Sequence, residues 1–320
     1  MIQQLGVPHP AIGHVPYLRE MVLQQYPNAK FNEDGNHRMT EDELIAFLSD
    51  CDAAIMGGDI ISDRLLRELP RLRNIGIFGV GLNTVDLEAC QRHGVKLGHR
   101  SGTNRLAVAE LALTFMITSL RWVTQLNMAM REGKRPRTRI GRNLTGRVVG
   151  IHGCGHIGKE VVRLLQPFNC TILANDQKDM GDFYAQYGVQ AVSFDELVER
   201  SEVLSLHLPL TRATRDLYNA EVLDRLREDC VLINTCRGGI VNEQALMERL
   251  ESGRILAAGF DVFDIEPAQN DRLLRHPNLI ATPHVGASTR DARIAMVGAA
   301  IDGLTQGRLV DPVDYADYMA

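Results

Sequence analysis

The sequence lacks the cysteine patterns of a disulfide-stapled or zinc-binding protein. Its six cysteines are scattered, with no Cys-x-x-Cys pair and no zinc-like cluster. This usage is typical of a protein in a reducing cytosol, and we expect no metal site. The N-terminus has no basic region followed by an apolar core, so we expect no signal peptide. Together these absences predict a cytoplasmic protein.

An excess of positive charge is also absent. Lys and Arg number 35 against 40 Asp and Glu, and the formal net charge is −5. This balance argues against a nucleic acid partner. One short basic run, Arg131–Arg139, is interpreted as a solvated loop, with phosphate binding as the less favoured alternative.

Long hydrophobic runs are missing as well. The longest apolar stretch, Leu106–Leu120, is interrupted by Glu110 and is too short to span a bilayer. We therefore expect a buried or interfacial helix and no membrane association. The helical pattern continues to Met130 and is apolar nearly all round, which predicts that Leu106–Met130 forms the contact surface of a homodimer.

The most informative feature that is present is a glycine motif near the middle of the chain. An apolar run from Val149 leads into Gly153, Gly155 and Gly158, which have the spacing Gly-x-Gly-x-x-Gly, with His156 and Ile157 at the start of the following segment. Glycines at this spacing let the backbone leave a strand, approach a pyrophosphate and enter a closely packed helix. The motif predicts a dinucleotide bound at a helix N-terminus.

An acidic residue follows at the distance that a dinucleotide site requires. A second strand-like run, Cys170–Asp176, ends in Asp176, 18 positions after Gly158, where a carboxylate binds a ribose diol. Gln177 comes next and Lys178 is the only nearby cation, so the sequence favours NAD over NADP. The alternative is a purely structural turn that binds no ligand.

Strands and helices alternate along most of the 320 residues, a length that favours two domains. Predicted strands after residue 147 are Val203–Leu206, Val231–Asn234, Ala257–Asp261 and Leu279–Thr282, and predicted helices are Ser193–Arg200, Asn219–Arg227 and Asn242–Gly253. The first hundred residues repeat this alternation, with strands at Ala53–Met56, Asn74–Phe78 and Val95–Leu97 and helices at Thr40–Ser49, Ser62–Glu68 and Thr84–His93. Ser193 with Glu196 and Thr40 with Glu43 have the spacing of capping boxes. The alternation predicts parallel sheets covered on both faces.

The order of these segments predicts the domain organisation. A complete small α/β unit precedes the glycine motif, and the segment Thr289–Leu304 has the composition of a helix that returns to that unit. We therefore assign residues 1–100 and 288–320 to a substrate domain and residues 101–287 to an inserted cofactor domain.

Polar residues at predicted strand ends are candidates for chemistry. Hydride transfer to or from an alcohol carbon needs a proton carrier and a cation that holds the substrate, and parallel sheets place such groups at their carboxyl ends. Arg237 follows one strand and can bind a carboxylate with two hydrogen bonds. His284 follows another and can shuttle a proton near neutral pH. Glu266 is placed to pair with His284, and Asp261 to accept a hydrogen bond from the nicotinamide carboxamide.

Several ordered motifs resemble those of the D-isomer-specific 2-hydroxyacid dehydrogenase family. They are Ile233–Val241 (INTCRGGIV), Gly259–Phe263 (GFDVF) with Glu266-Pro267, and Thr282–Gly286 (TPHVG). The resemblance covers roughly Leu44–Leu304. It implies that Arg237 binds the substrate carboxylate and carbonyl, that His284 is the acid/base, and that Glu266 acts on His284.

The resemblance also implies further site residues. Gly79–Asp86 is similar to the family's substrate loop, which assigns Val80 and Gly81 to the substrate, and Ser101–Glu110 is similar to its domain crossover. The remaining residues placed beside the cofactor are Leu208, Pro209 and Thr211, then Thr235, Cys236 and Gly286. The implied fold is a Rossmann NAD domain inserted in a flavodoxin-like substrate domain, both of them doubly wound α/β units with parallel sheets.

Within the family the chain is most similar to D-3-phosphoglycerate dehydrogenases, with two departures. Many of those enzymes have an arginine-serine pair where this chain has Gly57-Gly58-Asp59, and an acid there disfavours a phosphate. The chain ends at Ala320, so we expect no serine-sensing regulatory domain. The substrate stays open among 3-phosphoglycerate, glyoxylate or hydroxypyruvate, and branched or aromatic 2-keto acids.

Two other functions compete with a 2-hydroxyacid dehydrogenase. Some relatives of this family are NAD(H)-sensing corepressors that keep the same site residues, but the sequence shows no disordered extension or partner-binding tail. A dehydrogenase of another anion, phosphite or formate, is the third hypothesis. Formate enzymes carry glutamine in place of the paired glutamate, so Glu266 argues against formate.

Overall fold

The strands of the chain pair in parallel, as the alternation of strands and helices predicts. The computed structural model describes residues 2–34 and 38–310. Contacts divide the chain into two units, one formed by the chain up to Asn104 and from Ser288 onward, the other by Arg105–Ala287. The sequence places the first boundary at residue 100.

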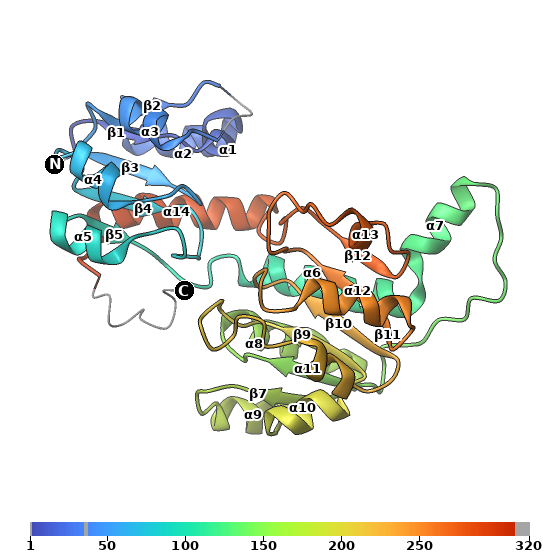
Figure 1. The fold of residues 1–320 in the computed structure, drawn as a ribbon. Helices are drawn as coiled ribbons and strands as arrows, with labels where there is room; N and C mark the ends of the chain where they lie inside the picture. Colours follow the sequence, from blue (N-terminus) through green and yellow to red (C-terminus); the bar gives the residue numbers. More distant parts are fainter. Residues whose placement is uncertain (1, 35–37, 311–320) are drawn as a thin grey trace. The chain divides into compact units, whose positions relative to one another are not determined.

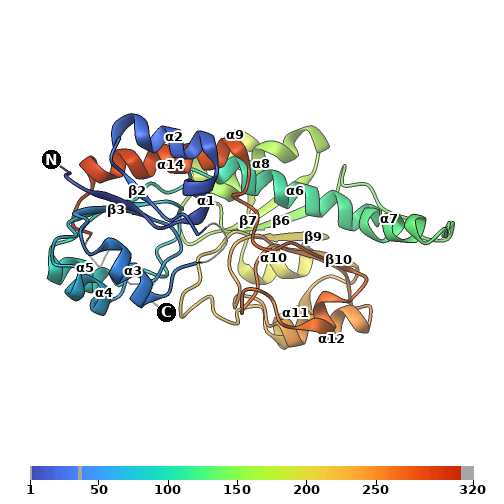
Figure 2. The same ribbon diagram turned by 90° about the horizontal axis from the view of Figure 1, so that it is seen from above.

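The first unit is a five-stranded sheet of order β2-β1-β3-β4-β5. This is the flavodoxin-like order, so that expectation is confirmed. Its strands are β1 (Leu5–Val7), β2 (Lys30–Phe31), β3 (Ala53–Met56), β4 (Asn74–Ile77) and β5 (Lys96–Gly98). One face is covered by α1 (Pro10–His14), α2 (Pro16–Gln25) and α14 (Arg290–Gln306), and the other by α3 (Glu41–Leu48), α4 (Asp63–Glu68) and α5 (Leu87–His93) (Figure 2).

Local capping explains where the helices of this unit begin. Thr40 and Glu43 form the predicted capping box of α3, and the Ser62 hydroxyl accepts the Leu65 amide at the start of α4. The prediction that a helix starts at Thr84 is wrong, because α5 begins at Leu87. Val85 instead pairs with Ile61 in a β-bridge, and the Asp86 side chain caps the helix.

The second unit is a seven-stranded sheet of order β12-β11-β10-β9-β6-β7-β8. Counted from β6, this order is that of a Rossmann fold with one added strand. Its strands are β6 (Val148–His152), β7 (Thr171–Asn175), β8 (Gln190–Ala191), β9 (Val203–Leu206), β10 (Cys230–Asn234), β11 (Ile255–Phe260) and β12 (Leu279–Ala281). Helices α6 (Arg105–Arg121), α8 (His156–Leu165) and α9 (Gly181–Tyr187) cover one face (Figures 1 and 2). On the other are α10 (Phe194–Arg200), α11 (Ala220–Arg225) and α12 (Glu243–Glu251), while η1 (Gln166–Phe168) and α13 (Asp271–Leu274) are short connecting turns.

The period of two along each strand sends alternate residues into two cores. Val203, Val231 and Ile233 pack under α6 and α8, whereas Leu204 and Leu232 pack under α10 to α12. Both faces are therefore largely apolar, and the loops at the strand ends are left to carry most of the polar side chains.

The prediction of one long helix over Leu106–Met130 is wrong. The helix breaks at Trp122, which has a left-handed backbone (φ 56°), and α7 (Val123–Arg131) leaves α6 at 63°. The buried Trp122 indole donates a hydrogen bond to the Ile140 carbonyl, which ties the break to the returning loop. One face of α6, with Ala112 and Phe115, is buried in the unit's core, so the apolar residues of this helix do not all form an exposed contact surface.

Helix α7 stands away from the sheet and buries none of its residues (Figure 1). Every residue from Arg131 to Ile140 is exposed, as the solvated-loop interpretation expects. Within the described residues no single helix is long and apolar enough to cross a bilayer, and only the bent pair α6 and α7 has that length together.

Candidate active site

The glycine motif forms the turn between β6 and α8. Gly153 has a positive φ of 90°, and a Cβ there would lie 2.6 Å from the His207 carbonyl oxygen. A Cβ on Gly158 would collide with the Gly153 carbonyl. Gly155 differs, because nothing lies within 4 Å of its Cβ position and no side chain in the described part of the chain caps α8. Two glycines therefore serve packing, and the third leaves open space at a helix N-terminus, where an anion is favoured.

Asp176 lies beside this turn, just after β7. Its carboxylate accepts the Cys154 amide (2.6 Å) and the Lys178 amide (2.8 Å). The first bond links the carboxylate directly to the glycine turn. Sequence reasoning identified the acid by its spacing but not this bond, which holds the carboxylate beside the glycine turn.

The loops after β9 and β10 carry the other predicted cofactor residues. Pro209 is fixed through its carbonyl, which accepts the Thr214 hydroxyl (2.6 Å), and Thr214 also bonds the Thr211 amide. Leu208 packs against Gly153. The Thr235 hydroxyl is buried and has no partner among the described residues, which marks it for a ligand at this edge.

Asn234, which the sequence analysis missed, shapes the loop that carries Arg237. Its side-chain oxygen accepts the Cys236 amide (3.1 Å), and its amide donates to the Arg237 carbonyl (2.9 Å). The sequence did contain a signal for this role, because Asn234 is a polar residue at the end of an otherwise apolar strand. Gly238 completes the turn, because any Cβ there would collide with the Phe263 carbonyl. This close approach brings the Arg237 loop against the loop after β11.

The loop after β12 is organised by Asp261. This buried carboxylate accepts the Thr282 hydroxyl (2.5 Å), the Val285 amide (2.8 Å) and the Gly286 amide (2.7 Å). The Asp261 carbonyl also accepts the His284 amide (2.8 Å). Sequence reasoning gave Asp261 a nicotinamide contact, which stays a prediction, but it did not foresee these bonds.

His284 and Glu266 are in contact. His284 has a left-handed backbone (φ 53°), and its Nδ1 lies 2.7 Å from Glu266 Oε2. The other Glu266 oxygen accepts the Phe263 amide (3.1 Å). A carboxylate only accepts, so Nδ1 carries the proton of this bond and Nε2 is left for other chemistry. A non-glycine residue with positive φ at such a position is typical of a functional site.

The surroundings of Glu266 favour its charged form. Burial acts to raise the pKa of Glu266, but the His284 hydrogen bond and charge, the Phe263 amide and the Arg237 charge outweigh it, so the pKa is lowered. Arg237 itself is half-buried and donates to the Cys236 carbonyl (2.6 Å). The loops after β10, β11 and β12 thus bring a guanidinium, a carboxylate and an imidazole to one edge of the sheet.

Other titratable groups near this edge do not compete for the acid/base role. Burial lowers the pKa of His207 to about 3 and that of His152 to about 4, so both are neutral at pH 7. Burial also raises the pKa of the Cys236 thiol to about 11, which makes it a poor nucleophile.

The predicted substrate residues Val80 and Gly81 follow β4 in the first unit, and the Val80 carbonyl lies 3.0 Å from His99 Nε2. Asp59, the acid noted in the sequence, is buried and accepts the Gly57 amide (3.0 Å), while the Arg38 guanidinium packs against Gly58. Burial raises the pKa of Asp59. The acid noted in the sequence is thus a buried side chain that accepts a hydrogen bond from the backbone of its own loop.

An α/β unit with a Rossmann strand order, a glycine turn and an acid after the second strand defines a dinucleotide-binding protein. A profile described as "D-isomer specific 2-hydroxyacid dehydrogenase, NAD binding domain" matches residues 113–286. The chain belongs to the D-isomer-specific 2-hydroxyacid dehydrogenase family, and the prediction of an NAD-binding domain is confirmed.

Relatives cover most of the chain. It is 32% identical to the hydroxypyruvate reductase of Thermotoga maritima over 282 residues, which are 86% of this chain and 91% of that protein. It is 33% identical to the D-3-phosphoglycerate dehydrogenase of Bacillus subtilis over 256 residues, 79% of this chain but only 48% of that enzyme. A glyoxylate reductase structure from Paecilomyes thermophila superposes with a TM-score of 0.83 at 26% identity, covering 96% of this chain and 95% of that one. The corepressor alternative receives no support from these comparisons.

The residues present fit NAD. The open face of Gly155 and the first turn of α8 would hold the pyrophosphate, Asp176 the ribose, and the unpartnered Thr235 hydroxyl another polar group of the cofactor. These assignments rest on the geometry above.

The glycine turn allows a paired test. Gly155→Ala adds a methyl group to open space, so we expect unchanged thermal stability and an NADH affinity reduced about ten-fold or more, because the backbone can no longer approach the pyrophosphate. Gly158→Ala places a methyl group against the Gly153 carbonyl and should destabilise the protein by about 1–3 kcal/mol. Thermal unfolding and NADH fluorescence titration of both variants measure this. Equal destabilisation of the two, or full NADH affinity in Gly155→Ala, would contradict the assignment.

Proposed function

We propose that the chain is an NAD-dependent dehydrogenase that interconverts a small D-2-hydroxy acid and its 2-keto acid. The observation that supports this most directly is the 2.7 Å contact between His284 Nδ1 and Glu266 Oε2, with the Arg237 charge acting on the same carboxylate. This group lies at the carboxyl edge of a sheet whose glycine turn fits NAD.

His284 is the proton carrier of the proposed reaction. With Nδ1–H held by Glu266, Nε2 gives a proton to the C2 oxygen during keto acid reduction and takes it back during hydroxy acid oxidation. The ionised Glu266 stabilises the imidazolium form that reduction requires. The imidazole is half exposed, so a substrate can reach Nε2.

Arg237 binds the substrate carboxylate. Its planar guanidinium can donate two parallel hydrogen bonds to a carboxylate and polarise the adjacent C2 carbonyl. The Asn234 bonds and the Gly238 contact fix the backbone on either side of it. Bound NADH would supply the hydride to C2, and with the proton from His284 this gives the hydroxy acid and NAD⁺.

The substrate class follows from the site and the relatives together. The first candidates are hydroxypyruvate, glyoxylate and 3-phosphoglycerate, which are named by the relatives described above, and we assign Val80 and Gly81 to binding the substrate. We place the protein in the cytoplasm, because all six cysteines are free thiols.

A 2-keto acid panel with NADH and NADPH in parallel tests the proposal. We expect oxidation of NADH, and little of NADPH because Asp176 repels a 2′-phosphate, with at least one small 2-keto acid. His284→Gln should lower kcat by about 10² to 10⁴. The exposed His14 provides the control, and His14→Gln should retain the wild-type rate. NADH binding with no turnover of any keto acid, or a wild-type rate in His284→Gln, would refute the proposed activity.

The role of Glu266 is tested by the pH dependence of kcat/KM for keto acid reduction. The Glu266 pKa is lowered, so the carboxylate is ionised through neutral pH and favours the imidazolium. In Glu266→Gln the carboxylate that holds the Nδ1 proton and favours the charged ring is lost. The kcat/KM profile for keto acid reduction should therefore move to the acidic side. An unchanged profile with only a uniform loss of rate would show that Glu266 acts by packing alone.

We also propose a homodimer that uses α7 and the loop after it. This arm exposes apolar side chains, Met128 at 58%, Met130 at 67% and Ile140 at 84%, which water disfavours. Wild-type protein should have the mass of two 35.6 kDa chains by light scattering. Met128→Glu with Met130→Glu should give a folded monomer, because charge is costly in a buried contact. A monomeric wild type, or a dimer that persists in the double variant, would exclude this interface.

A further inference from the structure

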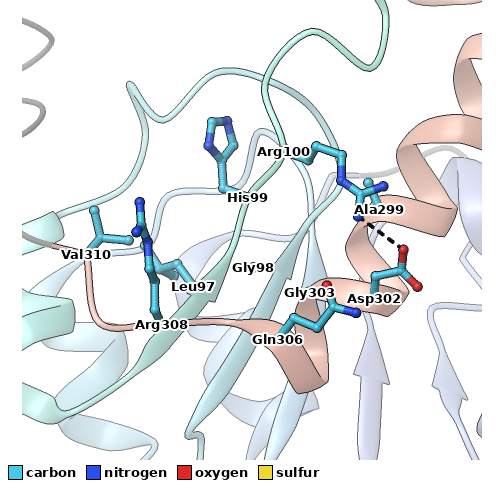
Figure 3. A pocket seen from close by; sticks show the side chains of 10 residues that line it. All are labelled: Leu97, Gly98, His99, Arg100, Ala299, Asp302, Gly303, Gln306, Arg308 and Val310. Atoms are coloured by element: carbon cyan, nitrogen blue, oxygen red, sulfur yellow. Dashed lines mark hydrogen bonds and ion pairs between the residues drawn. The ribbon is translucent and has the colours of Figure 1, made fainter.

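A pocket of about 140 Å³ opens in the first unit, between the end of β5 and the C-terminal half of α14 (Figure 3). None of the residues assigned to substrate or cofactor lines it. Its volume corresponds to about four or five water molecules at liquid density, enough for an inorganic oxyanion or a small carboxylate.

Two glycines make this pocket. Gly98 at the end of β5 and Gly303 on α14 approach so closely that a Cβ on either would meet the other's backbone. The helix therefore lies directly on the strand, and the wall between the flanking side chains is bare backbone (Figure 3). Backbone walls with charged side chains around them are typical of a site for a small polar ligand.

The charges around the pocket do not balance. Arg100 pairs with Asp302 (Nη2 to Oδ2, 3.3 Å) on one side. Arg308 lies on the other side (Figure 3), and its guanidinium has no hydrogen bond or ion pair with any described residue. Its backbone is fixed, because Arg308 and Leu97 exchange both hydrogen bonds of an antiparallel bridge. Two guanidinium groups thus face one carboxylate, which leaves one positive charge for a ligand.

The pocket is connected to the predicted substrate loop. His99, which lines the pocket, has its Nε2 3.0 Å from the carbonyl oxygen of Val80. A carbonyl only accepts, so Nε2 carries the proton of this bond. Gly98, His99 and Arg100 are consecutive, so a ligand held at Arg100 lies one residue from the hydrogen bond between His99 and Val80.

We propose that this pocket binds a small oxyanion, a phosphate or carboxylate group, between the guanidinium groups of Arg308 and Arg100. Occupancy orders the substrate loop through His99 and the Val80 carbonyl. The second statement rests on the proposed function, whereas the first does not.

Binding is tested by NMR on the full chain, through the amide signals of Gly98 and Gly303. Inorganic phosphate and acetate are titrated separately at constant ionic strength, which distinguishes the two sources of the oxyanion. We expect saturable shifts with at least one of them, and about a ten-fold or greater loss of affinity in Arg308→Met, since a charge-assisted pair of hydrogen bonds is removed. Arg71→Met, another exposed arginine of this unit, is the matched control and should bind like wild type.

Two outcomes overturn the site. Either the pocket amides shift with neither anion, or they shift equally in wild type and Arg308→Met. If Arg308→Met loses its native spectrum, the same titration is carried out on Arg100→Met, and the same loss of anion affinity is expected.

Coupling to the substrate loop is tested by kinetics. An anion in the pocket should lower the KM for the 2-keto acid, by about five-fold if the coupling is of ordinary size, whereas competition at Arg237 would raise it. His99→Phe, which cannot donate to the Val80 carbonyl, should lose the KM effect, and the NMR titration of the same variant measures its anion binding. An unchanged or raised KM in wild type, or a lowered KM that persists in His99→Phe, contradicts the coupling. If no keto acid is turned over, the proposed function fails while the NMR titration still decides the site.

Discussion

The geometry of the candidate site depends on the buried carboxylate of Asp261. Burying a charge is costly unless donors replace the lost water, and here one hydroxyl and two backbone amides of the loop after β12 do so. These bonds close that loop onto the end of β11 and hold His284 in its left-handed conformation. Without them the imidazole would have no fixed position relative to Glu266.

The loops after three neighbouring strands each contribute one functional group to the site. The loop after β10 supplies a permanent cation, the loop after β11 a carboxylate, and the loop after β12 an imidazole. Parallel pairing of β10, β11 and β12 places all three loops at one edge, and the contact of Gly238 with the Phe263 carbonyl brings the first two together. Apolar packing on both faces makes the sheet rigid. The polar site residues lie on loops that are fixed by hydrogen bonds from their own side chains.

The sequence predicts the fold to within a few residues where a physical signal is local. The two capping boxes at Thr40 and Ser193 and the period-two strands are such signals, and both strand orders follow the predicted folds. The break at Trp122 was not predictable, because it depends on an indole that bonds a residue 18 positions away. The sequence motifs identified Arg237, Glu266 and His284 as site residues, but they did not identify the contacts that position these side chains. Asn234 and the carboxylate contacts of Asp261 arise from tertiary contacts that no local pattern records.

If these three loops form a proton-transferring site beside a bound nicotinamide, the reaction carries deuterium from the cofactor to C2 of the substrate. The chain is incubated with NADH deuterated at C4 on either face, together with hydroxypyruvate or glyoxylate, and the hydroxy acid product is analysed by mass spectrometry and chiral chromatography. We expect deuterium at C2 from one face of the cofactor only, with the D configuration where C2 is a stereocentre, and loss of this product in Arg237→Ala. Absence of deuterium from the product with both cofactors, or equal transfer from both faces, would contradict it.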